Sequence, residues 1–253
     1  MIHLSPLILL GLGLIAGAAG FIDSVSGGGG LLTLPCLLLA SVPPQIALGT
    51  SKLCNTFGTS AAVFNFAKKG KINWQIVVHG LLFMLLGGVI GSRCMLFLPQ
   101  ALVGKIVIFL LPLGIASLFF KKTQDHLALP ITRKDKWIKI PALCFGLGIY
   151  DGFFGPGVGS FLILGLFTLC HRGMLESTAN AKVFNLASNI GALVIFILHG
   201  KVLFALGLVM AFFNVVGNYL GSHMAMKKGS DFIRVCLAGS FVLLLIVLAI
   251  KFL

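Results

Sequence analysis

Long apolar runs, separated by short loops that carry charge, proline or glycine, make up almost the whole chain. An α-helix rises about 1.5 Å per residue, so about 20 apolar residues cross roughly 30 Å of hydrocarbon. Eight of the ten runs are long enough to cross, and we therefore predict an all-α polytopic membrane protein. The ten predicted segments are 5–25, 29–41, 45–67, 73–97, 101–120, 139–154, 157–170, 177–199, 202–226 and 232–253.

Two of these segments, 29–41 and 157–170, are too short to cross the bilayer with ease, and each follows a glycine-rich break. Irregular backbone at membrane depth is tolerated only where protein or a cavity satisfies it. The pattern predicts broken or re-entrant half-helices here, and it leaves open whether they span.

The chain also repeats itself in the same order along its length, which indicates two homologous halves, 1–121 and 139–253, joined by a polar linker, 122–138. The motif Gly20–Asp23 with Gly27 and Gly29 returns 128 residues later as Gly148–Asp151 with Gly155 and Gly157, and Lys52, Asn55, Gly70, Lys71, Gly87, Gly91 and Ser92 return 130 residues later.

Each half holds five segments, an odd number, so the second half should enter the membrane from the opposite side as an inverted repeat. Of the 19 lysines and arginines, 13 fall on the side of the linker and 4 on the side of the termini, while Lys52 and Lys182 lie within segments. The positive-inside rule then makes the linker cytoplasmic. We predict a multi-pass protein of the bacterial inner membrane with both termini outside the cytoplasm.

Composition supports lipid as the main solvent. The chain is 58% hydrophobic and only 10% charged, against about 25% charged in soluble domains. Although the net charge is +13, the basic residues sit in short loops, which argues against a nucleic-acid partner. The six cysteines are scattered, without metal-site spacing, and no catalytic set is visible. We predict no metal, no cofactor and no enzymatic activity.

Two lysines inside membrane segments are the first candidates for chemistry, because a lysine at the bilayer centre costs about 2.5–3.5 kcal/mol and usually faces a cavity or a partner. Lys52 shares a helical face with Asn55, Thr56 and Thr59. Lys182 shares a face with Asn185 and Asn189. Polar stripes at equivalent places in the two halves predict one shared polar cavity between them.

Asp23 and Asp151 are equivalent as well, and they allow two readings. In one, they pair with the lysines and only lock the halves together. In the other, the lysines hold a substrate, and the aspartates titrate or compete with it, acting as coupling or ion-pair residues.

The glycine-rich breaks are the second duplicated feature. Gly27–Gly30 and Gly155–Gly159 each open a short helix, whose free N–H groups and positive dipole end can hold an anion. Alternatively, these glycines only permit close helix crossing. The predicted substrate-binding residues are Ser51, Lys52, Asn55, Thr59, Lys182, Asn185 and Asn189 with Gly28, Gly29, Gly30, Gly157 and Gly159.

The run from Gly17 to Pro35, with Asp23 and four consecutive glycines, followed by Ala47-x-Gly-Thr-Ser-Lys-x-x-Asn55, resembles the sulfite exporter TauE/SafE family of permeases. The second half carries a degenerate copy in 148–159 and 179–185, where Pro156 departs from Gly28 of the first half. The resemblance implies a permease for a small sulfur-containing anion such as sulfite, thiosulfate or an organosulfonate.

We therefore predict a secondary transporter that carries a small anion by alternating access around a central cationic site, driven by a proton or sodium gradient or by the substrate's own gradient. A passive anion channel with the same residues and a non-transporting membrane scaffold are the alternatives. The direction of transport and the oligomeric state do not follow from the sequence.

Overall fold

The computed structural model describes residues 6–99, 102 and 130–252, and the described part is built of helices. Gly229, with φ 73° and ψ −158°, interrupts the last helix between the two segments predicted there. The predicted segment 101–120 lies outside the described residues except for Leu102. The helices are α1 (Pro6–Ser26), α2 (Gly30–Leu39), α3 (Pro44–Lys68), α4 (Trp74–Leu96), η2 (Asp135–Lys139), α7 (Ile140–Phe153), α8 (Val158–Leu169), α9 (Met174–Leu198) and α10 (Phe204–Phe252).

Helix lengths confirm the helical membrane class but modify the expected number of spans. Within the described residues, α1, α4, α9 and the part of α10 from Phe204 to Cys236 are long and apolar enough to cross a bilayer. Helix α3 has 25 residues, but its polar stripe lowers its hydropathy. Helix α7 has only 14 residues, shorter than the expected span at 139–154, and η2 extends it at its N-terminal end. The two short helices, α2 and α8, have 10 and 12 residues.

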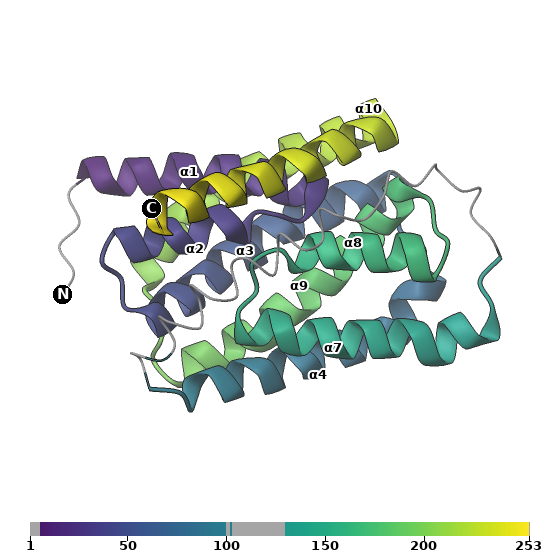
Figure 1. Cartoon of the computed structure of the whole chain (residues 1–253), viewed down its shortest axis with the longest axis horizontal. Coiled ribbons are helices and arrows are strands. Elements are labelled where there is room, and N and C mark those ends of the chain that lie inside the picture. The colour runs from purple at the N-terminus through teal and green to yellow at the C-terminus, as the bar shows by residue number, and fades with distance from the viewer. Residues whose placement is uncertain (1–5, 100–101, 103–129, 253) are drawn as a thin grey trace.

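The helices pack in a regular order that crosses the two halves (Figure 1). Helix α1 lies along α10, and α4 lies along α7, so the first helix of each half packs against the fourth helix of the other. Helices α3 and α9 pack between these outer pairs and touch each other. The short helices α2 and α8 lie in the middle of the molecule, and the start of α1 and the end of α10 lie at the same end (Figure 1).

Close approach of α4 and α7 explains one set of repeated glycines. A Cβ on Gly148 would lie 2.7 Å from the Met84 carbonyl oxygen and 3.1 Å from Gly87 Cα, closer than packed atoms allow. Because lipid provides no hydrophobic drive between helices, such small residues permit the backbone contact that stabilises the pair. The same helix carries Gly146, where a Cβ would meet nothing within 4 Å, so only one face of α7 requires glycine.

A capping contact recurs at equivalent places in the two halves. The backbone N–H of Asn73, just before α4, donates to Asn180 Oδ1 of α9 at 2.9 Å. The backbone N–H of Leu203, just before α10, donates to Thr50 Oγ1 of α3 at 3.0 Å. Since the first N–H groups of a helix have no partner within it, each long inner helix supplies an acceptor at the start of a helix in the other half of the chain, α9 for α4 and α3 for α10.

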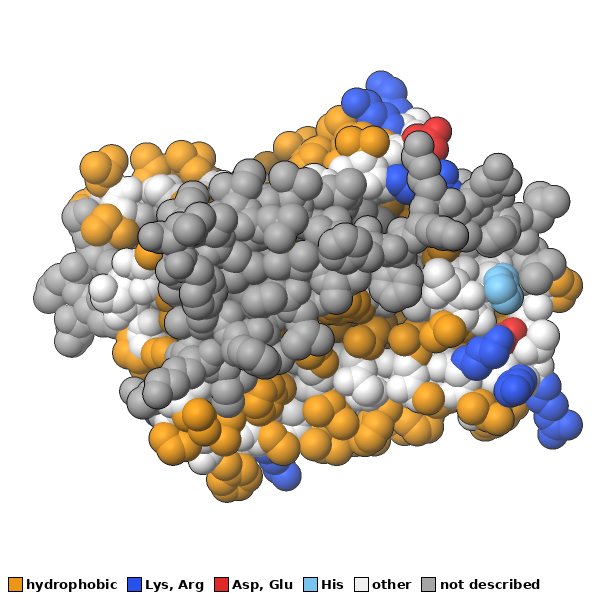
Figure 2. Space-filling view, viewed as in Figure 1, with side chains coloured by type: hydrophobic (Ala, Val, Ile, Leu, Met, Phe, Trp, Pro, Cys, Tyr) orange, Lys and Arg blue, Asp and Glu red, His pale blue; other side chains and the backbone are white. Residues whose placement is uncertain are grey.

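The surface has the polarity expected of a membrane protein, apolar on its flanks and charged at its ends. Large apolar side chains such as Phe64, Val78, Phe212 and Leu220 are exposed on the long helices, whereas serines, asparagines, lysines and aspartates are buried. Figure 2 shows most of the visible Lys and Arg side chains gathered at one end, with hydrophobic side chains along the flank.

Candidate functional site

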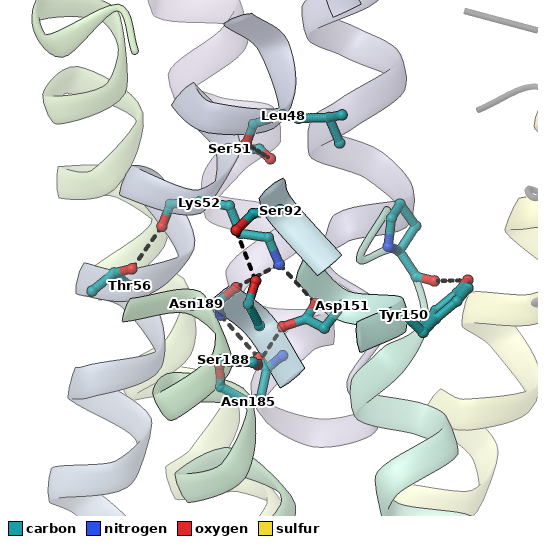
Figure 3. Close-up of polar contacts among 12 residues, drawn as sticks. Leu48, Ser51, Lys52, Thr56, Ser92, Tyr150, Asp151, Asn185, Ser188 and Asn189 are labelled. Carbon is teal, nitrogen blue, oxygen red and sulfur yellow. Dashed lines mark hydrogen bonds and ion pairs between the residues drawn. The ribbon is translucent and has the colours of Figure 1, made fainter. Parts of the chain in front are cut away.

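A buried ion pair joins the two halves at the centre of the molecule. Lys52 Nζ, on α3, lies 2.7 Å from Asp151 Oδ1, on α7, and donates a second hydrogen bond of 3.0 Å to Asn189 Oδ1 of α9. The other carboxylate oxygen of Asp151 accepts a short hydrogen bond from Ser188. Figure 3 shows these side chains converging from three helices. With side chains 4% and 2% exposed, both charges are nearly removed from solvent and depend on these partners.

The second lysine forms the equivalent pair with fewer bonds. Lys182 Nζ, on α9, lies 2.9 Å from Asp23 Oδ2, on α1. Within the described residues, Lys182 Nζ makes no hydrogen bond of acceptable geometry. Asp23 Oδ1 accepts a long bond of 3.4 Å from the Gly29 N–H. The Lys182 side chain is fully buried, whereas that of Asp23 is 11% exposed. The two pairs are therefore crossed between the halves but unequally coordinated.

The two glycine-rich breaks meet between these pairs. Gly27 and Gly155 both have positive φ, 77° and 97°, a conformation that glycine adopts without strain. A Cβ on Gly159 would lie 2.5 Å from Gly27 Cα, so the breaks touch through their backbones. The Ser160 hydroxyl, at the start of α8, donates to the Ser26 carbonyl at 2.7 Å and closes the junction.

A small pocket lies at this junction, and most of the residues predicted from the sequence line it. Charged, amide and backbone groups share its wall with apolar side chains. The lining residues are Asp23, Gly27, Gly30, Leu34, Ser51, Lys52, Asn55, Asp151, Phe154, Gly155, Pro156, Val158, Asn185 and Asn189.

Six predicted substrate-binding residues lie outside the wall of this pocket. Lys182 contacts Asp23, which lines the pocket, but does not line it itself. The Thr59 hydroxyl is buried without a partner among the described residues. Gly28, Gly29, Gly157 and Gly159 belong to the glycine breaks but do not line the pocket.

Sequence reasoning missed several contributors, of which Ser188 is the most informative. Ser188 binds the carboxylate of Asp151, but the position 130 residues earlier is Gly58. A search for repeated polar residues cannot find a side chain that only one half carries. The helical face that Lys182 shares with Asn189 does not include Ser188, whose side chain points to α7 instead. Phe154 and Leu34, which form the apolar wall, were not predicted either.

Helix ends add partial positive charge to a pocket that is lined by Lys52 and by the carboxylates of Asp23 and Asp151. Gly30 and Val158, the first residues of α2 and α8, both line it, so the N-terminal ends of two helices face the same space. Free N–H groups and the positive end of the helix dipole favour an anion there. In the described residues, no group of three or more His, Cys, Asp or Glu side chains could hold a metal ion.

Comparison with known proteins points to one family. A family model described as Sulfite exporter TauE/SafE matches residues 12–252. A probable membrane transporter protein, ORF9, of a Sinorhizobium species is 38% identical over 93% of this chain and 88% of its own. A probable membrane transporter protein of Haemophilus influenzae is 37% identical over 85% of this chain and 84% of its own. The probable membrane transporter protein YfcA of Escherichia coli K12 is 36% identical over 91% of this chain and 85% of its own. No solved structure matches the chain at a significant level.

Proposed function

The chain belongs to the sulfite exporter TauE/SafE family of membrane transporters, and from this premise we propose that it is a secondary transporter for a small sulfur-containing anion. The observation that carries the proposal is the central pocket, in which a buried lysine, amide side chains and two helix N-termini converge. The family name supports a sulfur-containing substrate, and the pocket supports an anion of small size.

The chemistry of the pocket favours a small anion over a neutral or cationic solute. Lys52 contributes an ammonium group, and Asn55 and Asn185 contribute amide N–H donors from equivalent places on α3 and α9. Hydrogen bonds with a charged partner are shorter and roughly twice as strong as neutral ones. The apolar side chains of Leu34 and Phe154 on the same wall limit water, which strengthens these interactions.

We propose alternating access between two inverted repeats, 1–121 and 139–253, linked by 122–138. The crossed packing of α1 with α10 and of α4 with α7 supports this arrangement, as do the recurring capping contacts. Motion of one repeat against the other would open the central site to one side at a time. The basic residues gathered at one end support a cytoplasmic linker and an inner-membrane location with both termini outside (Figure 2).

Thermal stabilisation of the purified protein tests the proposed ligand class. We expect sulfite, thiosulfate or methanesulfonate to raise the melting temperature, and choline, a cation, to leave it unchanged at the same ionic strength. Lys71, an exposed lysine outside the pocket, provides a matched control. Lys71→Ala should respond to the anion like the wild type, whereas Asn185→Ala should require a higher anion concentration. No response to any sulfur-containing anion would refute the ligand class.

Liposomes separate the transporter from its two alternatives. A secondary transporter should accumulate the anion against its gradient when a second gradient is imposed, and it should exchange labelled for unlabelled anion. A passive channel would show flux that cannot be driven uphill. A non-transporting scaffold would give the same flux as protein-free liposomes.

A further inference from the structure

The central site is electrically balanced before any substrate enters. Its charged groups among the described residues are Lys52 and Asp151, which line the pocket, and Lys182, which pairs with the lining residue Asp23. Two positive and two negative charges sum to zero. Adding a monovalent anion would leave one uncompensated negative charge in a medium of low dielectric constant, which is strongly unfavourable. A proton taken up by one of the carboxylates would restore the balance.

The two carboxylates differ in how firmly their ionised form is held. Asp151 is bonded to both Lys52 and Ser188, and Lys52 is fixed further by Asn189. In the first half, the positions equivalent to Ser188 and Asn189 are Gly58 and Thr59. Glycine supplies no donor there, and the hydroxyl of the threonine has no partner among the described residues.

Asp23 is consequently the weaker-held carboxylate. Apart from the ion pair with Lys182, its carboxylate accepts a long hydrogen bond of 3.4 Å from the Gly29 N–H. It is also the more accessible one, since 11% of its side chain is exposed against 2% for Asp151, and it lines the pocket. Both carboxylate oxygens of Asp151 are bonded to side-chain donors, whereas Asp23 has the one ion pair and the long Gly29 contact and is the carboxylate more open to the pocket.

Among the described residues, the other carboxylate in the wall of the pocket is Asp151, which is held by Lys52 and Ser188. The cysteines on the neighbouring helices, Cys36 on α2 and Cys54 on α3, are thiols, which are uncharged near neutral pH. Helix α8 carries no titratable side chain, and on α10 the histidine nearest in sequence to the α1 contact, His223, is exposed. The titratable groups on the other elements packed against α1 are Cys36 on α2, Lys52, Cys54 and Lys68 on α3, and Lys182 and Glu176 on α9, of which Glu176 pairs with Arg172. Asp151 of α7 lies across the pocket.

We propose that Asp23 carries one proton with each anion, while Asp151 stays ionised and paired with Lys52. This inference rests on the proposed function, because it concerns the same pocket. When Asp23 is protonated, it no longer neutralises Lys182, and the freed positive charge compensates the anion. One anion and one proton therefore cross the membrane together. A monovalent anion is carried without net charge, and a divalent anion is carried with one net negative charge.

Proteoliposomes test the inference with methanesulfonate, which stays a monoanion over the working pH range. A one-unit pH gradient, acid outside, should sustain about tenfold accumulation, since one pH unit is a tenfold ratio of protons. A potassium–valinomycin potential should not change that accumulation. Thiosulfate, which is divalent, should respond to the potential as well. Accumulation of methanesulfonate that follows the potential and ignores the pH gradient would overturn the inference and leave the transporter proposal standing.

Substitutions identify the carboxylate. Asp23→Asn should abolish the response to the pH gradient and leave downhill flux or exchange that now responds to the potential. Asp231→Asn, at an aspartate whose side chain is 95% exposed, is the matched control and should keep the pH response. A pH response that survives in Asp23→Asn overturns the assignment. If Asp23→Asn does not fold, the wild-type measurements still decide the one-proton stoichiometry. Absence of both binding and flux for all sulfur-containing anions would refute the proposed function and this inference together.

Discussion

At the scale of single residues, Ser188 is the contact whose energy can be isolated most cleanly. Its hydroxyl donates to the buried carboxylate of Asp151, and hydrogen bonds to charged groups are worth about 1.5–3 kcal/mol. Ser188→Ala should therefore lower the free energy of unfolding by that amount. Ser92 is also buried and lies within a helix, but it donates to the backbone carbonyl of Gly88. Ser92→Ala should cost about 0.5–1.5 kcal/mol. Equal losses, measured by unfolding in denaturing detergent, would contradict the role of Ser188.

Substitutions in the Lys52–Asp151 pair distinguish a role in anion binding from a purely structural role. Lys52→Ala leaves the Asp151 carboxylate buried and unpaired, which should cost about 3–5 kcal/mol of stability. The double variant Lys52→Ala/Asp151→Asn removes both charges and should recover most of that loss. Anion affinity should nonetheless remain about 10- to 100-fold weaker than in the wild type, because one charge-assisted contact is missing. Binding at wild-type affinity by the stable double variant would exclude Lys52 from the site.

Much of this residue-level picture follows from the repeat, and its gaps have a physical reason. The duplication of Lys52 and Asp23 at Lys182 and Asp151 predicted that four charges lie near one cavity, and both lysines do contact aspartates. Sequence could not say that each lysine pairs with the aspartate of the other half. That choice depends on how the halves pack, and helical periodicity specifies only the face of a single helix.

At the scale of helices, the close contact of α4 and α7 offers a matched pair of substitutions on one helix. Gly148→Ala would place a Cβ 2.7 Å from the Met84 carbonyl and should destabilise the protein by about 1–3 kcal/mol. A Cβ on Gly146 would meet nothing within 4 Å, so Gly146→Ala should be neutral or stabilising by up to about 1 kcal/mol through helix propensity. If thermal melting shows that both variants behave alike, close glycine packing does not hold these helices together.

The start of η2 is stabilised by a capping arrangement outside the membrane-spanning helices. The Thr132 N–H and hydroxyl donate to the Asp135 carboxylate, and the Asp135 N–H donates back to the Thr132 hydroxyl. Burial alone would raise the pKa of Asp135, but bonds from Lys139 and Thr132 lower it from an ordinary 3.8 to about 2. Lys139 also lies 2.7 Å from Asp135 Oδ1 and caps the Leu169 carbonyl at the end of α8.

A lowered pKa in the folded state stabilises this turn above the ordinary pKa of an aspartate, and the effect is lost as the pH falls. Hydrogen exchange of residues 130–139, corrected for intrinsic rates, should therefore rise between about pH 4 and pH 2. In Asp135→Asn, exchange should be faster at neutral pH and nearly independent of pH across that window. Unchanged protection in the variant would show that the carboxylate does not hold the turn.

The bounds of the helices could be predicted closely from the sequence. The segments 5–25, 45–67 and 73–97 lie within two residues of α1, α3 and α4, because apolar runs end where charge, proline or glycine begins. The segment 139–154 agrees equally well with α7, which begins at Ile140 and ends at Phe153, and η2 runs directly into it. The interruption at Gly229 lies between the predicted segments 202–226 and 232–253, at a positive φ that glycine adopts without strain.

At the scale of the whole molecule, the proposed inverted repeat makes one prediction that no single helix can make. Lys69 and His199 stand 130 residues apart and are the exposed C-terminal caps of α3 and α9. In an inverted repeat, equivalent residues face opposite sides of the membrane. With the linker cytoplasmic, Lys69 should face the cytoplasm and His199 the outside.

Cysteine labelling in intact cells measures this directly. We would introduce Lys69→Cys and His199→Cys separately into a Cys94→Ser background, because Cys94 is exposed in the native protein. A membrane-impermeant maleimide should label His199→Cys in intact cells and Lys69→Cys only after the membrane is opened. The reverse pattern would overturn the orientation and preserve the repeat. Labelling of both from the same side would refute the inverted repeat itself, and with it the symmetric basis for alternating access, because the two halves could not then exchange shapes across the membrane.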